Sequence, residues 1–92
     1  MVLVTILRET PLGNTVQVAT LRQKFGRRLR EIRAQRRMTQ EQFAEALDVS
    51  VDFLSLIERG RSAPSFETLE QIAKRLRMSV ADLFNFSNRA PA

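Results

Sequence analysis

The feature that most restricts the fold is the very short connection between two predicted helices. Thr39 is placed to cap a helix over "QEQFAEAL" (40–47), and Gln42 completes a capping box at the third position of that helix. Ser50 is placed to cap a second helix over "VDFLSLIER" (51–59). Only residues 48–50 remain between the two segments. The two helices therefore cannot lie antiparallel and must cross at a steep angle.

Three further amphipathic segments predict an all-α domain of five helices. Apolar residues at spacings of four, four and three predict a helix from residue 21 to about residue 36: Leu21, Phe25, Leu29 and Ile32. Ser65 can cap "FETLEQIAKRL" (66–76), and Ser79 can cap "VADLF" (80–84). Gly60 suits the left-handed end of the 51–59 helix. The helices after the first are expected to bury the following core residues: Phe43, Ala44, Leu47, Leu54, Ile57, Phe66, Leu69, Ile72, Ala73 and Leu76.

The two ends of the chain differ from this domain, which we place at residues 21–86. In the N-terminal extension, residues 1–20, "VTILRE" and "TVQVAT" could form two short strands joined at "TPLGN". A single hairpin is marginally stable in water, so it would have to pack on the domain or on a second subunit. A loosely ordered leader is the alternative. Residues 87–92 are expected to form a flexible tail.

The residue types present argue against an enzyme. The chain has 92 residues and contains neither cysteine nor histidine. It therefore lacks a disulfide framework, a thiolate metal site and the usual acid–base group at neutral pH. We also find no nucleophile paired with a base, so we expect no catalytic residues, no metal and no cofactor.

The sequence also predicts a soluble, cytoplasmic protein. No apolar run approaches the roughly 18–20 residues that a membrane-spanning helix needs. The N-terminus lacks the basic start and the small-residue cleavage site of a secretory signal.

Positive charge is concentrated in one segment of the chain. The formal net charge is +5, and residues 22–37 contain eight basic residues against the single acid Glu31. This distribution suggests a polyanionic partner. Most arginines of the 21–36 helix are expected simply to face solvent. Arg36 and Arg37 are the best candidates for phosphate contacts because they precede the 40–47 helix directly.

Several motifs occur together in the order and spacing of one known family. They are "TQEQFA" at the start of the 40–47 helix, "VS" at the turn, "IERG" at the end of the 51–59 helix, "PS" with "TL" at the next helix start, and "LF" near residue 84. In these motifs residues 25–84 resemble the lambda-repressor-like, Xre-type helix-turn-helix family of bacterial and phage DNA-binding regulators. The resemblance implies a transcriptional regulator, a repressor or controller, whose 51–59 helix enters the major groove of DNA.

The resemblance also implies roles for single residues. Positions that read bases or face the groove are occupied by Ser50, Val51, Asp52, Ser55 and Leu56. Positions that contact the DNA backbone are occupied by Gln40, Arg59, Arg61 and Ser62. Arg33 and Glu58 match a structural ion pair that joins the first helix to the end of the third. A charged Glu58 close to Leu54 would need such a partner on physical grounds as well.

The predicted reading face departs from the family pattern in its chemistry. Val51, Asp52 and Leu56 stand where related proteins often place Arg, Lys or Gln, which read bases through two hydrogen bonds. Leu56 is instead expected to press on a thymine methyl group. The alternative is that Leu56 and Val51 belong to a protein-binding patch. In that case the protein is an interaction module, such as an antitoxin or adaptor, that uses the 51–59 helix face or the N-terminal segment.

Apolar residues near the C-terminus suggest a homodimer. Val80, Phe84 and Phe86 exceed what a small core already filled by Leu83 is expected to hold. We therefore predict that these three residues form the dimer contact, to which the N-terminal strands could add. A twofold dimer would set two reading helices about 34 Å apart and would bind double-stranded DNA at an inverted-repeat operator.

Overall fold

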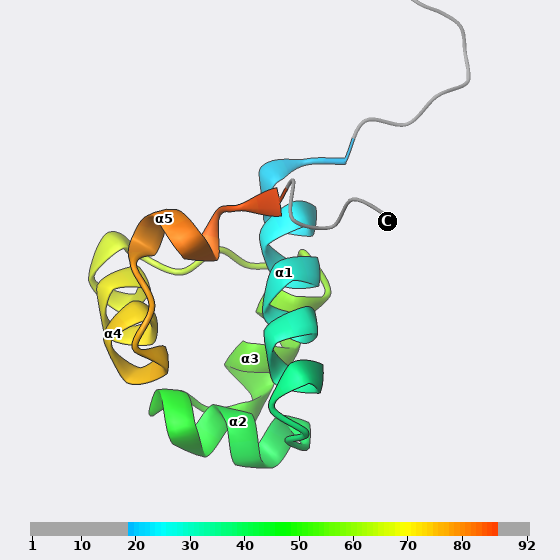
Figure 1. The fold of residues 1–92 in the computed structure, drawn as a ribbon. Coiled ribbons are helices and arrows are strands. Elements are labelled where there is room, and N and C mark those ends of the chain that lie inside the picture. The colour runs from blue at the N-terminus through cyan, green and yellow to red at the C-terminus, as the bar shows by residue number, and fades with distance from the viewer. Residues whose placement is uncertain (1–18, 87–92) are drawn as a thin grey trace, which may run out of the picture.

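Five short helices make up the described chain, which in this computed structural model comprises residues 19–86 (Figure 1). They are α1 (Leu21–Gln35), α2 (Gln40–Leu47), α3 (Val51–Glu58), α4 (Phe66–Leu76) and α5 (Val80–Leu83). The all-α, five-helix expectation is confirmed. The hairpin or leader expected within residues 1–20 lies almost entirely outside the described residues, as does the tail at 87–92.

Every helix begins at a hydroxyl side chain that accepts a hydrogen bond from the backbone three residues later. The capping residues are Thr20, Thr39, Ser50, Ser65 and Ser79. Four of these starts were predicted, and the reciprocal capping box of Thr39 with Gln42 is confirmed. Thr20 forms a second complete box with Gln23 that the sequence analysis missed. These local bonds fix where each helix starts. The starts of α2 and α3 are therefore set by residues within three positions of their caps, Thr39 and Ser50.

Four helices end in the same left-handed turn. At the end of α3, the Arg61 N–H donates to the Leu56 carbonyl and the Gly60 N–H donates to the Ile57 carbonyl, both at 2.9 Å. Gly60 has a φ of 74°, as its position predicted. The corresponding turn residue after α1, α2 and α4 is not glycine: Arg37, Asp48 and Arg77 have φ values of 58°, 61° and 58°. These three residues hold a conformation that L side chains adopt at a cost.

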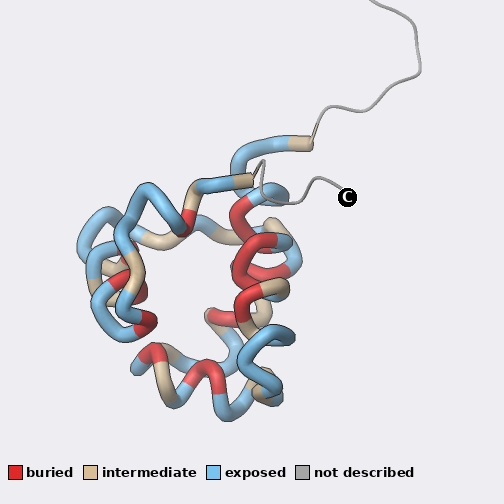
Figure 2. The backbone as a smooth tube through the Cα atoms, viewed as in Figure 1, coloured by how far each residue is buried: buried red, intermediate tan, exposed pale blue. Residues whose placement is uncertain are grey.

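The core lies where the inner faces of the helices meet (Figure 2). It consists of Phe25, Leu29, Ile32, Phe43, Ala44, Leu47, Leu54, Ile57, Leu69, Ile72, Ala73, Leu76 and Leu83. One expectation was wrong, because Phe66 is 82% exposed; Leu21, from the apolar stripe of the first helix, is 59% exposed. Both residues stand in the first turn of their helix, beside a groove at one end of the bundle, and so lie outside the closed core.

Helix α1 lies against the end of α3 at a point where only glycine fits. A Cβ atom at Gly26 would lie 2.3 Å from the carbonyl oxygen of Ile57 and 2.7 Å from that of Glu58. Real carbon atoms do not approach backbone oxygen so closely, so any side chain here would push the two helices apart. Gly26 therefore sets the distance between α1 and the predicted reading helix.

Three long polar side chains close the carbonyl ends of helices distant in sequence. Arg28 is 7% exposed and donates from Nε and Nη2 to the Asp82 carbonyl at the end of α5, at 3.2 and 2.8 Å. Arg36 donates from Nη2 to the Leu76 carbonyl of α4 at 2.9 Å. Gln71 donates to the last carbonyl of α2 at 2.7 Å. The expectation that helix-one arginines face solvent is thus wrong for Arg28, which satisfies a helix end inside the domain.

The aromatic residues after α5 turn back onto their own domain. The ring of Phe84 stacks on that of Phe25 with 5.0 Å between centroids, and Phe86 lies 5.9 Å from Phe84. Both residues are partly buried against the core, whereas Val80 is 40% exposed. The three residues thus do not all fit the core, as expected, although Phe84 and Phe86 find partial cover there; the dimer contact at these residues stays a prediction. Among residues 19–86, no helix combines the length and the apolar composition needed to cross a bilayer.

Replacing Gly26 with alanine should destabilise the fold severely, because the added methyl group meets backbone carbonyls that cannot rotate away. We expect the free energy of unfolding to fall by about 3 kcal/mol, measured by urea denaturation. Gln35→Ala, an exposed change on the same helix, is the control and should stay within about 0.5 kcal/mol of the parent. Equal stability of G26A and the parent chain would contradict the close approach of α1 and α3.

Replacing Arg77 with glycine should stabilise the protein, because glycine adopts the left-handed turn after α4 without strain. We expect a gain of about 0.5–1 kcal/mol in the free energy of unfolding and a higher Tm. Arg75→Gly places the same change inside α4, where it should cost about 1 kcal/mol. Destabilisation by both changes to a similar degree would show that residue 77 does not hold the left-handed turn in solution.

Candidate nucleic-acid interface

The outward face of α3 gathers the residues that the sequence analysis assigned to base reading. Leu54 and Ile57 are buried on the inner face, together with Glu58. Asp52 and Leu56 lie on the opposite side of the helix, since each is two positions from Leu54, a rotation of about 200°, and Ser55 lies at the edge between the two sides. Val51 and Asp52 are exposed, whereas Ser55 and Leu56 are half-buried. The assigned residues therefore form one mixed polar and apolar strip along α3, beginning at its cap, Ser50.

Arginines flank the C-terminal end of this strip. Arg59 is exposed, and its Nε donates to the Ser55 carbonyl at 3.3 Å, which holds the guanidinium against the last turn of α3. Arg61 is exposed in the loop that follows, and Ser62 is half-buried. The left-handed turn at Gly60 directs the chain from α3 into this loop. The cationic side chains of Arg59 and Arg61 thus lie beside the C-terminal end of the strip.

A buried carboxylate connects α3 to the two helices before it. Glu58 is 3% exposed, and its oxygens accept three hydrogen bonds. Arg33 of α1 donates from Nε at 2.9 Å and from Nη2 at 3.0 Å, and Gln40 of α2 donates from Nε2 at 3.0 Å. Burial of a carboxylate is tolerated only with such a set of donors. Arg33 and Glu58 thus form a bidentate ion pair that joins α1 to the end of α3.

The bond from Gln40 to Glu58 was not foreseen and bears on the predicted phosphate contact. Gln40 is the first residue of α2, and its amide is fixed against the last residue of α3. The Thr39 cap accepts from the Gln42 N–H. The backbone N–H groups of Gln40 and Glu41 precede the first bonds of the helix and are therefore the ones open to an anion. No pattern within either helix indicates a bond between residues this far apart in sequence.

The two arginines before α2 differ in their surroundings. Arg36 already donates to the Leu76 carbonyl, which ties its side chain to the end of α4. Arg37 is exposed at the left-handed turn one residue later. Of this predicted pair, Arg37 is the better placed to meet a phosphate at the start of α2.

The acidic residues of the described chain do not form a metal site. Within residues 19–86 no three acidic side chains come together as potential ligands. Asp48, the nearest acid to the α2–α3 turn, instead lies 3.5 Å from the Arg75 guanidinium on the surface.

Comparison with known proteins gives the same assignment over most of the domain. The helix-turn-helix family model HTH_3 matches residues 29–83. The HTH-type transcriptional regulator DdrOP3 of Deinococcus deserti is 43% identical over 60 residues, which make up 65% of this chain and 46% of that protein. The immunity repressor of Bacillus phage phi105 is 43% identical over 56 residues, or 61% of this chain and 39% of the repressor. This chain therefore spans less than half the length of either relative.

A solved structure supports the family at the level of the fold. The crystal structure of the clp gene regulator ClgR from C. glutamicum has a TM-score of 0.68 and 37% sequence identity with this chain. The similarity covers 82% of this chain and 97% of that one. The span matched by the family model contains α2 through α5 and the second half of α1. This chain belongs to the lambda-repressor-like, Xre-type helix-turn-helix family of DNA-binding regulators.

Proposed function

We propose that this protein regulates transcription by binding double-stranded DNA with α3 in the major groove. The observation that carries this proposal is the position of the α3 strip, which is solvent-facing and lies next to the open N-terminus of α2. A helix inserted into the groove needs both features, since one reads bases and the other holds the backbone. The name of the phage relative supports a role as a repressor.

The composition of the strip suggests which bases it reads. Leu56 and Val51 offer methyl groups that fit the methyl group of thymine, and Asp52 can accept a hydrogen bond from a cytosine amine. Ser50 and Ser55 can pair with any base edge. No residue of this strip offers the two parallel donors that select guanine. The preference for particular DNA sequences would therefore depend on the shape of the DNA and on apolar contacts with its bases more than on hydrogen bonds.

Phosphate contacts in this proposal gather at the C-terminal end of the strip, because Gln40 at the start of α2 contacts Glu58 at the end of α3. The α2 N-terminus with Gln40 and Arg37 would hold one phosphate group, and Arg59, Arg61 and Ser62 would hold another beyond the end of α3. Arg36 shares its guanidinium with α4 and is a weaker candidate. Glu58 acts here as a positioning residue, because its carboxylate fixes the Gln40 amide.

A homodimer on an inverted repeat completes the proposal. Val80 is the exposed large apolar residue of α5, and Phe84 and Phe86 follow it in the chain with part of their surface uncovered. A twofold contact at this end would present two α3 helices to successive major grooves, about 34 Å apart.

Replacing Arg61 with alanine should weaken binding to any duplex and make binding less dependent on salt. Each phosphate contact that is lost removes about one released counterion, so the slope of log Kd against log salt should fall by about 1. Arg27→Ala removes an exposed arginine from α1 and is the matched control. Equal slopes for R61A and R27A would contradict the proposed contact beyond α3. Fluorescence anisotropy with a labelled duplex at several salt concentrations measures both slopes.

Replacing Leu56 with alanine should remove the contribution of one thymine methyl group. On a duplex selected from a random pool, changing the contacted thymine to deoxyuridine should weaken binding of the parent chain about fourfold, as expected for roughly 0.8 kcal/mol per buried methyl group. The same base change should not weaken L56A further. Leu21→Ala, the same change at an exposed residue outside the strip and the dimer contact, is the control and should keep the parent's sensitivity to deoxyuridine. If L56A responds to deoxyuridine as the parent does, Leu56 does not read thymine.

A further inference from the structure

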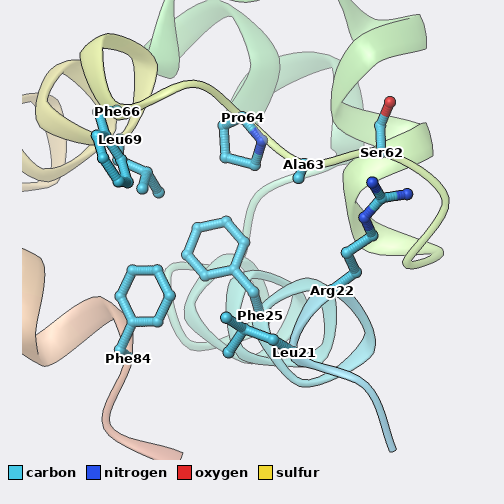
Figure 3. A pocket seen from close by; sticks show the side chains of 9 residues that line it. All are labelled: Leu21, Arg22, Phe25, Ser62, Ala63, Pro64, Phe66, Leu69 and Phe84. Atoms are coloured by element: carbon cyan, nitrogen blue, oxygen red, sulfur yellow. The ribbon is translucent and has the colours of Figure 1, made fainter.

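An apolar groove lies at the end of the bundle away from α2. It has a volume of about 420 Å³ and runs between the start of α1, the loop after α3, the start of α4 and the chain after α5. Figure 3 shows the rings of Phe25 and Phe84 facing Pro64, Leu69 and Phe66 across the open space. The charged residue in its lining is Arg22, at one edge beside Ser62. A groove of this size and composition accepts several aliphatic side chains and offers little to a charged ligand.

The two most exposed large apolar side chains of the described chain belong to this groove. Phe66 is 82% exposed and Leu21 is 59% exposed, whereas Val51 and Val80, which lie elsewhere, are about half as exposed as Phe66. Each of the two groove residues follows a helix cap directly, so its backbone is fixed by hydrogen bonds and the side chain cannot withdraw into the core. Such a fixed, clustered apolar surface favours a partner that covers it.

We infer that residues 2–7 of the chain, "VLVTIL", lie in this groove and cover Leu21 and Phe66. The position of the segment supports this occupant, because Leu21 is both part of the groove and the first residue of α1. The described chain therefore begins, at Ala19 and Thr20, directly before a residue that lines the groove. Eighteen residues precede the described chain, and among them only Arg8 and Glu9 are charged.

The chemistry and the reach of the segment fit the groove. In an extended conformation Val2, Val4 and Ile6 would point to the same side, which gives three adjacent aliphatic side chains. Residues 8–18 can span well over 20 Å at about 3.3 Å per residue, and Pro11 with Gly13 provides a place for the chain to reverse. The segment can thus fold back over a groove that starts next to its own attachment point.

Attachment favours the chain's own segment over a second copy. Covalent attachment through a short stretch of chain gives the segment an effective concentration in the millimolar range. A second copy at micromolar concentration would have to bind about a thousandfold more tightly to displace it. We therefore assign the groove to the segment of the same molecule.

Paramagnetic NMR on the full chain tests this assignment. The chain has no cysteine, so Thr5→Cys provides one site for a nitroxide label on the side of the segment that we expect to face away from the groove. The amide signals of Ala63, Phe66, Leu69 and Phe84 should lose intensity. The amide signals of α2, which lies at the opposite end of the bundle (Figure 1), should keep theirs.

Two further samples complete the test. The first sample mixes isotopically labelled parent chain, which carries no nitroxide, with nitroxide-labelled T5C chain that carries no isotope. The groove signals of the parent chain should keep their intensity, because the contact is within one molecule. Phe66→Ser should restore the groove signals in spin-labelled T5C, and Val80→Ser, a matched exposed apolar change, should not. Equal losses at the groove and at α2, or losses that occur only in the mixture, would overturn the assignment. Both serine variants alter exposed side chains, and their circular dichroism verifies that the helices persist.

Discussion

The arrangement of the domain depends on the hydrogen bonds that the buried carboxylate of Glu58 accepts. It lies at the end of α3, is almost fully buried, and accepts hydrogen bonds from Arg33 of α1 and Gln40 of α2. The close passage of α1 at Gly26 brings the backbone of the same α3 turn to the distance at which these bonds form. Three helices are therefore held at one point. The outer face of α3 and the N-terminus of α2 take their relative positions from it, and so would any DNA they bind.

Local signals predicted the helices well because the bonds that start them are local. Thr39, Ser50, Ser65 and Ser79 each bond to the backbone three residues later, and a sequence pattern contains both partners. The family resemblance rested on such patterns as well. The ends of α1, α2 and α4 fall where the amphipathic patterns stop, but the left-handed turns that follow them were not foreseen, because arginine and aspartate at these turns carry no signal comparable to that of Gly60.

What the sequence could not show depends on contacts between distant residues. Arg28 is buried where it donates to the carbonyl of Asp82, 54 positions away in the sequence. The amide of Gln40 is oriented by the carboxylate of Glu58, 18 positions away. Phe66 matched a core pattern, yet it stands outside the core because no described element covers the first turn of α4. The stacking of Phe84 on Phe25 was not foreseen for the same reason, since it depends on how the whole bundle packs.

The central claim is that α3 enters the major groove, and chemical modification of DNA tests it directly. Dimethyl sulfate methylates guanine at N7, in the major groove, and adenine at N3, in the minor groove. In a methylation-interference experiment on a selected duplex, modified guanines within each half-site should be depleted from the bound fraction, and modified adenines should not. Interference confined to adenine N3, or bound and free fractions with the same modification pattern, would contradict the account.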